Sequence, residues 1–154
     1  MALERIVAHK RSEVAERKRR TDPATLRAGL TPSDRSLLKA LGRDRTGFVL
    51  ECKRASPSAG TLREPFDLDA IARAYAPLAD AVSVITDERF FGGSHASLSR
   101  VRALLEAPVL CKDFVVDPFQ VYEARSYGAD AILLMLSVLT DEEYAACAAA
   151  CESV

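Results

Sequence analysis

Three charged side chains end or interrupt apolar runs and could do chemistry together. Glu51 and Lys53 lie two residues apart, where the apolar run that begins at Phe48 turns into a polar loop. Residues i and i+2 of a strand point to the same face, so both charges should project together. Lys112 interrupts the run Val-Leu-Cys-Lys-Asp-Phe (109–114), and a buried strand rarely carries a lysine without a partner, because an isolated buried charge is costly. A structural ion pair is the simpler interpretation, but two lysines and a glutamate that converge favour a functional site.

Such a trio suits acid–base or carbonyl chemistry. A lysine in a half-apolar pocket can act as a general acid or, with a lowered pKa, as a Schiff-base nucleophile. Two lysines with few acids suggest an anionic substrate that carries carboxylate or phosphate. Phe91 and Phe114 follow two of the strands and would cover an aromatic part of it, although core packing explains them equally well. The segment Ser-Pro-Ser-Ala-Gly, which begins at Ser56, could contact a phosphate or simply form a loop.

Hydrophobic spacing predicts the elements that must position these residues. Helices are expected at 2–20, from Pro23, at 36–41, at 67–75, from Ser94, at 118–127 and from Thr140 to Val154. Apolar strands are expected at 48–53, 81–87, 108–114 and 129–137, with a loop at 88–93. By alternation, Lys112 and Phe114 share a face with Leu110, whereas Asp113 points the other way.

The chain is therefore expected to contain a helical extension at 1–46 and four βα units at 47–154. Strands buried on both faces and separated by helices indicate a parallel sheet of the α/β class. Two architectures fit this order: an open doubly wound sheet, or the first half of a (β/α)₈ barrel, which takes about 250 residues. No Gly-x-Gly-x-x-Gly fingerprint follows the first strand. Both architectures place sites at the carboxyl ends of strands, where the charged residues collect.

Composition excludes several classes of protein. The 154 residues are 49% hydrophobic with a net charge of −1, so no nucleic-acid partner is expected. The basic cluster 17–20 follows interleaved acids and indicates a solvated helix face. Neither a signal peptide nor a membrane-spanning run is expected, and the four cysteines suit the thiols of a cytoplasmic protein. Cys147 and Cys151 lie four apart on a helix, but no nearby His or Cys completes a metal site.

Three segments together resemble the strand-end motifs of the indole-3-glycerol phosphate synthase family. They are Glu-Cys-Lys-Arg-Ala-Ser-Pro-Ser-Ala-Gly (51–60), Thr-Asp-Glu-Arg-Phe-Phe-Gly-Gly-Ser (86–94) and Leu-Cys-Lys-Asp-Phe-Val-Val-Asp-Pro-Phe (110–119). Residues 129–139 resemble the fourth strand of that family, and the helical extension matches as well. The resemblance covers essentially the whole chain. It implies a (β/α)₈ barrel of tryptophan biosynthesis that closes the indole ring of 1-(2-carboxyphenylamino)-1-deoxyribulose 5-phosphate, with loss of carbon dioxide and water.

The resemblance also implies roles for individual residues. Lys112 would be the general acid that polarises the ketone and assists ring closure. Lys53 would pair with the substrate carboxylate, and Glu51 would position groups and help the dehydration. Ser56 would lie in the mobile first loop. The residues expected to line the pocket for the anthranilate ring are Phe91, Phe114 and Leu133. No metal or organic cofactor is implied.

Four βα units supply half of such a barrel. In the family, a catalytic Glu on the fifth strand, an Asn on the sixth and the phosphate-binding loops of the seventh and eighth come later. A half-barrel leaves two sheet edges and an inner face open. The 154 residues alone are therefore expected to be inactive, and either to join a missing C-terminal half-barrel or to form a homodimer through those edges.

Three further possibilities stay open. Segments 109–112 and 134–138 also resemble the bacterial bifunctional form, in which a phosphoribosylanthranilate isomerase barrel follows. A different enzyme would be a Schiff-base aldolase-type barrel that uses Lys112. A third possibility is a non-catalytic half-barrel that binds a partner half or another phosphorylated ligand.

Overall fold

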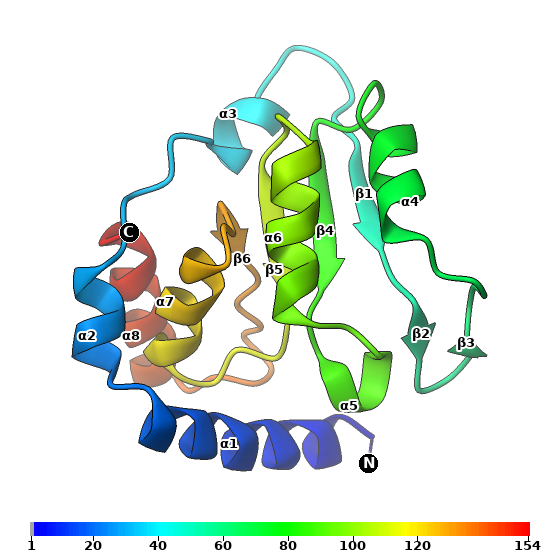
Figure 1. Ribbon diagram of the computed structural model, residues 1–154. Helices are drawn as coiled ribbons and strands as arrows, with labels where there is room; N and C mark the ends of the chain where they lie inside the picture. Colours follow the sequence, from blue (N-terminus) through cyan, green and yellow to red (C-terminus); the bar gives the residue numbers. More distant parts are fainter. Residues whose placement is uncertain (1) are drawn as a thin grey trace.

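The central sheet is parallel, and its strands follow one another in chain order (Figure 1). The computed structural model describes residues 2–154. The strands of this sheet are β1 (Val49–Cys52), β4 (Ala81–Ile85), β5 (Val109–Lys112) and β6 (Ala131–Ile132), in the order β1-β4-β5-β6. Each pairs in parallel with its neighbour in that order. The parallel sheet expected from the sequence is confirmed.

A helix follows each of these strands. The four helices are α4 (Leu68–Tyr75), α6 (His95–Leu104), α7 (Pro118–Ser126) and α8 (Asp141–Glu152). The expected caps are present: Asp67 accepts a hydrogen bond from the amide of Ala70 at the start of α4. At the start of α8, Thr140 and Glu143 form a capping box. These caps satisfy amides that have no partner inside the helix, and so define where each helix begins.

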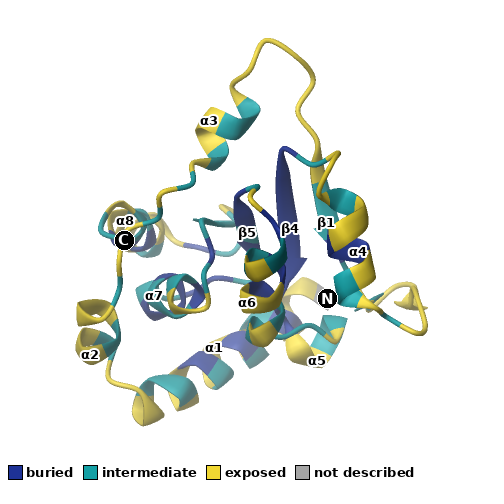
Figure 2. Cartoon of the chain, turned by 45° about the horizontal axis from the view of Figure 1, so that its top comes forward, coloured by how far each residue is buried: buried dark blue, intermediate teal, exposed yellow. Residues whose placement is uncertain are grey.

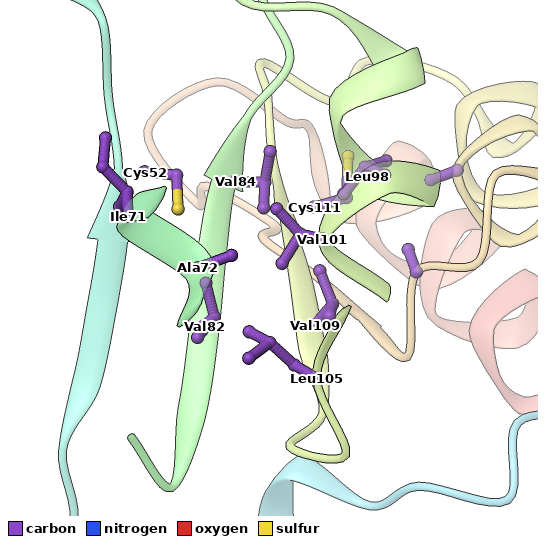
Figure 3. Packing of buried hydrophobic residues seen from close by; sticks show 12 residues of the cluster. Cys52, Ile71, Ala72, Val82, Val84, Leu98, Val101, Leu105, Val109 and Cys111 are labelled. Atoms are coloured by element: carbon purple, nitrogen blue, oxygen red, sulfur yellow. The ribbon is translucent and has the colours of Figure 1, made fainter. Parts of the chain in front are cut away.

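The main core lies between the sheet and the helices α4 and α6 (Figure 3). Successive side chains of a strand point to opposite faces, so alternate strand residues enter this core. Its buried members include Cys52, Ile71, Ala72, Val82, Val84, Leu98, Val101, Leu105, Val109 and Cys111. Ala124 of α7 belongs to the same cluster, so three helices cover one face of the sheet. A sheet that advances in one direction beneath helices on one face is singly wound, as in a barrel and unlike a doubly wound sheet.

Both edges of this sheet lack a neighbouring strand among the described residues. The central strand β4 is buried along its whole length, whereas Val49 of the edge strand β1 is 43% exposed and the preceding Phe48 is 53% exposed. Figure 2 shows β4 and β5 as the buried strands of the sheet, in contrast to the exposed segment that leads into β1. The other edge strand, β6, pairs only with β5. The arrangement is that of a partial barrel.

Three helices precede β1: α1 (Ala2–Arg20), α2 (Pro23–Ala28) and α3 (Leu37–Leu41). The first of them, α1, crosses the end of the sheet toward which the arrowheads of β1 and β4 point (Figure 1). Its apolar stripe packs there, with Val14 against Val116 and Phe119. Helix α1 therefore lies at the carboxyl ends of the strands, where parallel α/β proteins carry their sites.

Ion pairs also attach α1 to the rest of the fold. Arg17 Nη1 lies 2.8 Å from Glu123 Oε2 of α7, and Lys18 Nζ lies 2.7 Å from Asp117 Oδ2, the cap of that helix. The expectation that residues 17–20 form only a solvated face was wrong for these two residues. Each cation has a carboxylate partner on the barrel units, which the spacing of charges within α1 alone does not indicate.

Several expected elements differ in extent. Strand β6 spans Ala131–Ile132 rather than 129–137, and these two residues are the ones that pair with Leu110 and Cys111 of β5. The expected loop at 88–93 contains a short helix, α5 (Glu88–Phe91), and the loop after β1 contains a hairpin of β2 (Ala55–Ser56) and β3 (Gly60–Thr61). Helix α8 ends at Glu152 rather than continuing to Val154. None of the helices within residues 2–154 has the length and apolar character needed to cross a membrane.

Candidate active site

One carboxylate holds two lysines at the carboxyl ends of β1 and β5. The Oε1 atom of Glu51 lies 3.0 Å from Lys53 Nζ, and its Oε2 atom pairs with Lys112 Nζ. The strand register brings them together, since Glu51 lies opposite Ser83 on β4 and Lys112 lies opposite Ile85 on the same strand. The hydroxyl of Ser83 also donates to Glu51 Oε2 over 3.4 Å. We call Glu51, Lys53 and Lys112 the clamp. Together with Ser83, the clamp draws on three adjacent strands, β1, β4 and β5.

The electrostatics of the clamp keep Glu51 ionised. Partial burial alone would raise the pKa of Glu51, but the hydrogen bonds and charges of Lys112 and Lys53 outweigh it and lower the pKa below its usual value. Both ammonium groups stay in contact with solvent, with 42% of the Lys112 side chain and 34% of the Lys53 side chain exposed. The two cations are therefore available to a ligand.

A hollow of about 420 Å³ lies beside the clamp. The residues that line it are Lys53, Ile85, Asp87, Phe91, Lys112, Asp113, Phe114, Leu133 and Met135. The rings of Phe91 and Phe114 lie 6.0 Å apart with an angle of 39° between their planes, and they form what we call the aromatic wall. A hollow with an apolar lining and two ammonium groups suits a flat aromatic molecule that carries negative charge.

The turn after β4 places one side of the aromatic wall. Asp87 begins α5, and its Oδ1 atom accepts a hydrogen bond from the amide of Phe90 over 2.7 Å. The helix stops at Gly92, which has a φ of 63°, a left-handed conformation that glycine adopts without strain. A Cβ atom on Gly93 would come within 2.2 Å of the carbonyl oxygen of Ile85. The two glycines therefore let the chain fold back tightly against β4 and hold Phe91 over the hollow.

A family model described as indole-3-glycerol phosphate synthase matches residues 3–154. The chain belongs to this family. The family fold is a (β/α)₈ barrel, so the four βα units form part of such a barrel, and the clamp and the hollow lie on the face where barrels of this kind carry their active sites.

The chain is also similar to curated proteins that are much longer. The Tryptophan biosynthesis protein TrpCF of Vibrio parahaemolyticus is 55% identical over 152 residues, which are 99% of this chain and 32% of that protein. The protein of the same name from Vibrio cholerae is 54% identical over 142 residues, 92% of this chain and 30% of that protein. The Corynebacterium glutamicum protein is 49% identical over 149 residues, 96% and 31% respectively. The chain spans about a third of the length of these relatives.

The structure brings most of the residues expected for a synthase site together. Lys53, Lys112, Phe91, Phe114 and Leu133 all line the hollow. Glu51 binds both lysines from the adjacent strand. Ser56 is the exception, because it lies in the β2–β3 hairpin, where its Oγ atom accepts a hydrogen bond from the amide of Ala59 over 3.2 Å. The roles of all seven residues remain predictions.

Three charged residues near the hollow were not expected in the site. Asp87 and Asp113 line it, and both bind Lys10 of α1, whose side chain is only 1% exposed. A signal for Lys10 exists in the sequence, since it lies four residues from both Ile6 and Val14 and so shares their apolar stripe. A lysine inside an apolar stripe indicates a buried partner. Among residues 2–154 no group of three or more His, Cys, Asp or Glu side chains is arranged to hold a metal ion.

Glu51→Gln should remove a contribution to stability that depends on pH. A carboxylate with a lowered pKa stabilises the fold above its unfolded pKa, about 4.3 for glutamate, and this contribution is lost as the pH falls through the lower folded pKa. The thermal midpoints of the parent and the variant are expected to differ at about pH 7 and to approach each other as the pH falls below about 4.3 and through the folded pKa. Circular dichroism melts measure both, with the exposed Glu152→Gln as the control. A difference that persists unchanged at the lower pH would contradict the prediction.

Proposed function

We propose that this chain forms the part of an indole-3-glycerol phosphate synthase site that carries the general acid. The reaction is the closure of the indole ring of 1-(2-carboxyphenylamino)-1-deoxyribulose 5-phosphate, with loss of carbon dioxide and water, in tryptophan biosynthesis. The enzyme is accordingly a carboxy-lyase. The observation that carries the proposal is the shared carboxylate, since Glu51 holds Lys53 and Lys112 together beside the aromatic wall.

The geometry suits different roles for the two lysines. Lys112 donates a proton to the ketone oxygen as the ring carbon forms the new carbon–carbon bond, so that a hydroxyl group replaces the carbonyl. Lys53 pairs with the substrate carboxylate, which then leaves as carbon dioxide. Glu51 positions both cations and, as a carboxylate, accepts the proton that the new ring gives up, while the hydroxyl leaves as water with a proton from one of the ammonium groups. The anthranilate ring lies against Phe91, Phe114 and Leu133, which line one hollow.

The proton-donor role suits the observed pairing better than the Schiff-base alternative does. A Schiff base forms from an amine that is free to attack a carbonyl, whereas Lys112 Nζ is already paired with the carboxylate of Glu51. Borohydride reduction in the presence of a carbonyl substrate distinguishes the two. Mass spectrometry should show no stable adduct at Lys112, whereas an adduct there would support the aldolase-type reaction.

The proposed function is tested in a completed barrel. This protein consists of residues 1–154 of the present chain followed by the part of the Vibrio parahaemolyticus relative that lies beyond the 152 residues matched between the two. We expect it to form the indole product from the substrate, as followed by ultraviolet absorbance. The unaltered relative is the matched control for expression and assay conditions. A folded completed barrel that leaves the substrate unchanged, while the relative converts it, would overturn the proposal.

Two further features belong with this proposal. We infer that the chain comes from a bifunctional form with an isomerase barrel, which is supported by relatives about three times as long as the matched region. We also infer a cytoplasmic location, supported by four free cysteines. Burial raises the pKa of Cys52 to about 11 and that of Cys111 to about 12, so these thiols are inert core residues rather than nucleophiles.

A further inference from the structure

A single buried lysine of α1 binds two aspartates that line the hollow. Lys10 Nζ lies 3.0 Å from Asp87 Oδ2, 2.9 Å from Asp113 Oδ1 and 3.2 Å from Glu13 Oε2. The side chains of Lys10, Asp87 and Asp113 are each at most 2% exposed. A buried ammonium is costly unless carboxylates compensate its charge, and removal of one member leaves the others unpaired. The cluster therefore depends on all of its members.

Each of the two aspartates fixes the backbone of one side of the aromatic wall. Asp87 Oδ1 accepts the amide of Phe90, which is adjacent to Phe91 in α5. Asp113 Oδ1 accepts the amide of Phe114 itself, over 2.7 Å. The Thr86 hydroxyl donates to the other oxygen of Asp113, also over 2.7 Å. Both phenylalanines of the wall are thus attached to carboxylates that share one cation.

We propose that Lys10 is a positioning residue, which holds Phe91 and Phe114 in place through Asp87 and Asp113. The expected effect on substrate binding rests on the proposed function. The attachment of the two phenylalanines to Lys10 does not depend on it. Lys10 does not line the hollow, and acts through the two aspartates that do. Helix α1 thereby shapes the part of the pocket that receives an aromatic ring.

The charges of the cluster add a second effect. Asp87 and Asp113 face a hollow intended for an anion, and without Lys10 they would repel both each other and the substrate. Burial alone would raise the pKa of Asp113, but the attraction of Lys10 outweighs it and lowers that pKa. The pKa of Lys10 is correspondingly raised despite the opposing effect of its burial, because Asp113 and Asp87 favour its charged form. The two shifts agree in direction, and the cation neutralises part of the negative field in the pocket.

Attachment of α1 alone does not account for this arrangement. Lys18 provides an ordinary attachment, since it also joins α1 to a carboxylate, Asp117, at 2.7 Å, with 38% of its side chain exposed. Asp117 caps α7 and is not among the residues that line the hollow. Lys18 is therefore the control for Lys10: the same residue type on the same helix, also paired with a carboxylate, but more exposed and without a connection to the aromatic wall.

The test compares Lys10→Met with Lys18→Met in the completed barrel. Hydrogen–deuterium exchange should become several-fold faster in the peptides that contain Phe90 and Phe114 in Lys10→Met, and should stay unchanged there in Lys18→Met. The KM for the substrate should rise about 10-fold to 100-fold in Lys10→Met, with a smaller change in kcat, since misplacement of a binding wall has effects of this order. Equal exchange in the two variants at these peptides would overturn the proposal. A KM of Lys10→Met equal to that of the parent, where the parent is active, would overturn it as well.

A rescue variant keeps the test decisive if Lys10→Met does not fold. The triple variant Lys10→Met, Asp87→Asn, Asp113→Asn leaves no unpaired buried charge among these residues, and each asparagine oxygen can still accept its amide. Slow exchange at both peptides should return, and KM should fall toward the parent value. Exchange that stays fast in the folded triple variant would contradict the role of Lys10. If the parent shows no turnover, the proposed function fails. The exchange data then still show whether Lys10 holds the segments of Phe91 and Phe114 in place.

Discussion

Lys112→Met in the completed barrel should lower kcat by about 100-fold to 10,000-fold while the protein remains folded, because a positioned general acid contributes about that factor. The substitution removes the proton donor but keeps much of the side-chain length. KM should change much less, since Lys53 still binds the substrate carboxylate and the aromatic wall is intact. Steady-state kinetics and circular dichroism measure the two effects.

The control is Lys39→Met, a lysine on the exposed surface of α3. This variant should keep the activity of the parent. Retention of near-parental kcat in Lys112→Met would remove Lys112 as the acid. The same result would leave Lys53, held by Glu51, as an anion-binding residue in a site without an assigned proton donor.

The 154-residue chain on its own should neither turn over the substrate nor remain monomeric. Strands β1 and β6 each have one side without a partner strand among the described residues. Exposed strand edges pair with other chains. We expect dimers or larger species at micromolar concentration in analytical ultracentrifugation. Addition of the remaining barrel segment of the Vibrio parahaemolyticus relative should shift the chain into a 1:1 complex and produce activity.

A variant of the edge strand distinguishes strand pairing between chains from non-specific association. Val49→Lys places a charge on the exposed edge strand β1, where lysine opposes edge-to-edge association. Leu38→Lys changes a residue that is 83% exposed on α3 and serves as the control. We expect only Val49→Lys to reduce self-association. A monomeric chain that closes the ring near the rate of the completed barrel would contradict both the inactivity and the need for a partner half.

The order of elements and the location of the clamp could be predicted because both follow from local patterns. The strands are short apolar runs that end in Lys53 and Lys112, and strict alternation puts Glu51 and Lys53 on one face. Capping residues such as Asp67 and Thr140 indicate where the helices begin. These signals depend on neighbours in sequence, so one chain is enough to recognise them.

The rest depends on contacts between distant residues. Strand β6 is shorter than its apolar run because a strand needs a partner as well as a composition, and only Ala131 and Ile132 pair with β5. The role of Lys10 does not follow from the charges of α1 alone, because its partners Asp87 and Asp113 belong to two different strand ends. Sequence alternation correctly directed Asp113 away from Lys112, but it could not show what lies on that side.

The chain order of the sheet also bears on how the protein folds during synthesis. Each strand pairs with the one nearest to it in sequence, so each βα unit can add to the previous one as it leaves the ribosome. Helix α1 is made before the sheet, yet its residues Lys18 and Arg11 bind partners that lie 99 and 132 residues later in the chain. Each doubling of the loop length adds only about 0.6 kcal/mol to the free energy of loop closure, so the long separation does not prevent late docking of α1. Helix α1 is thus synthesised before the sheet but can dock only after it, and the aromatic wall is completed only after β5 has emerged.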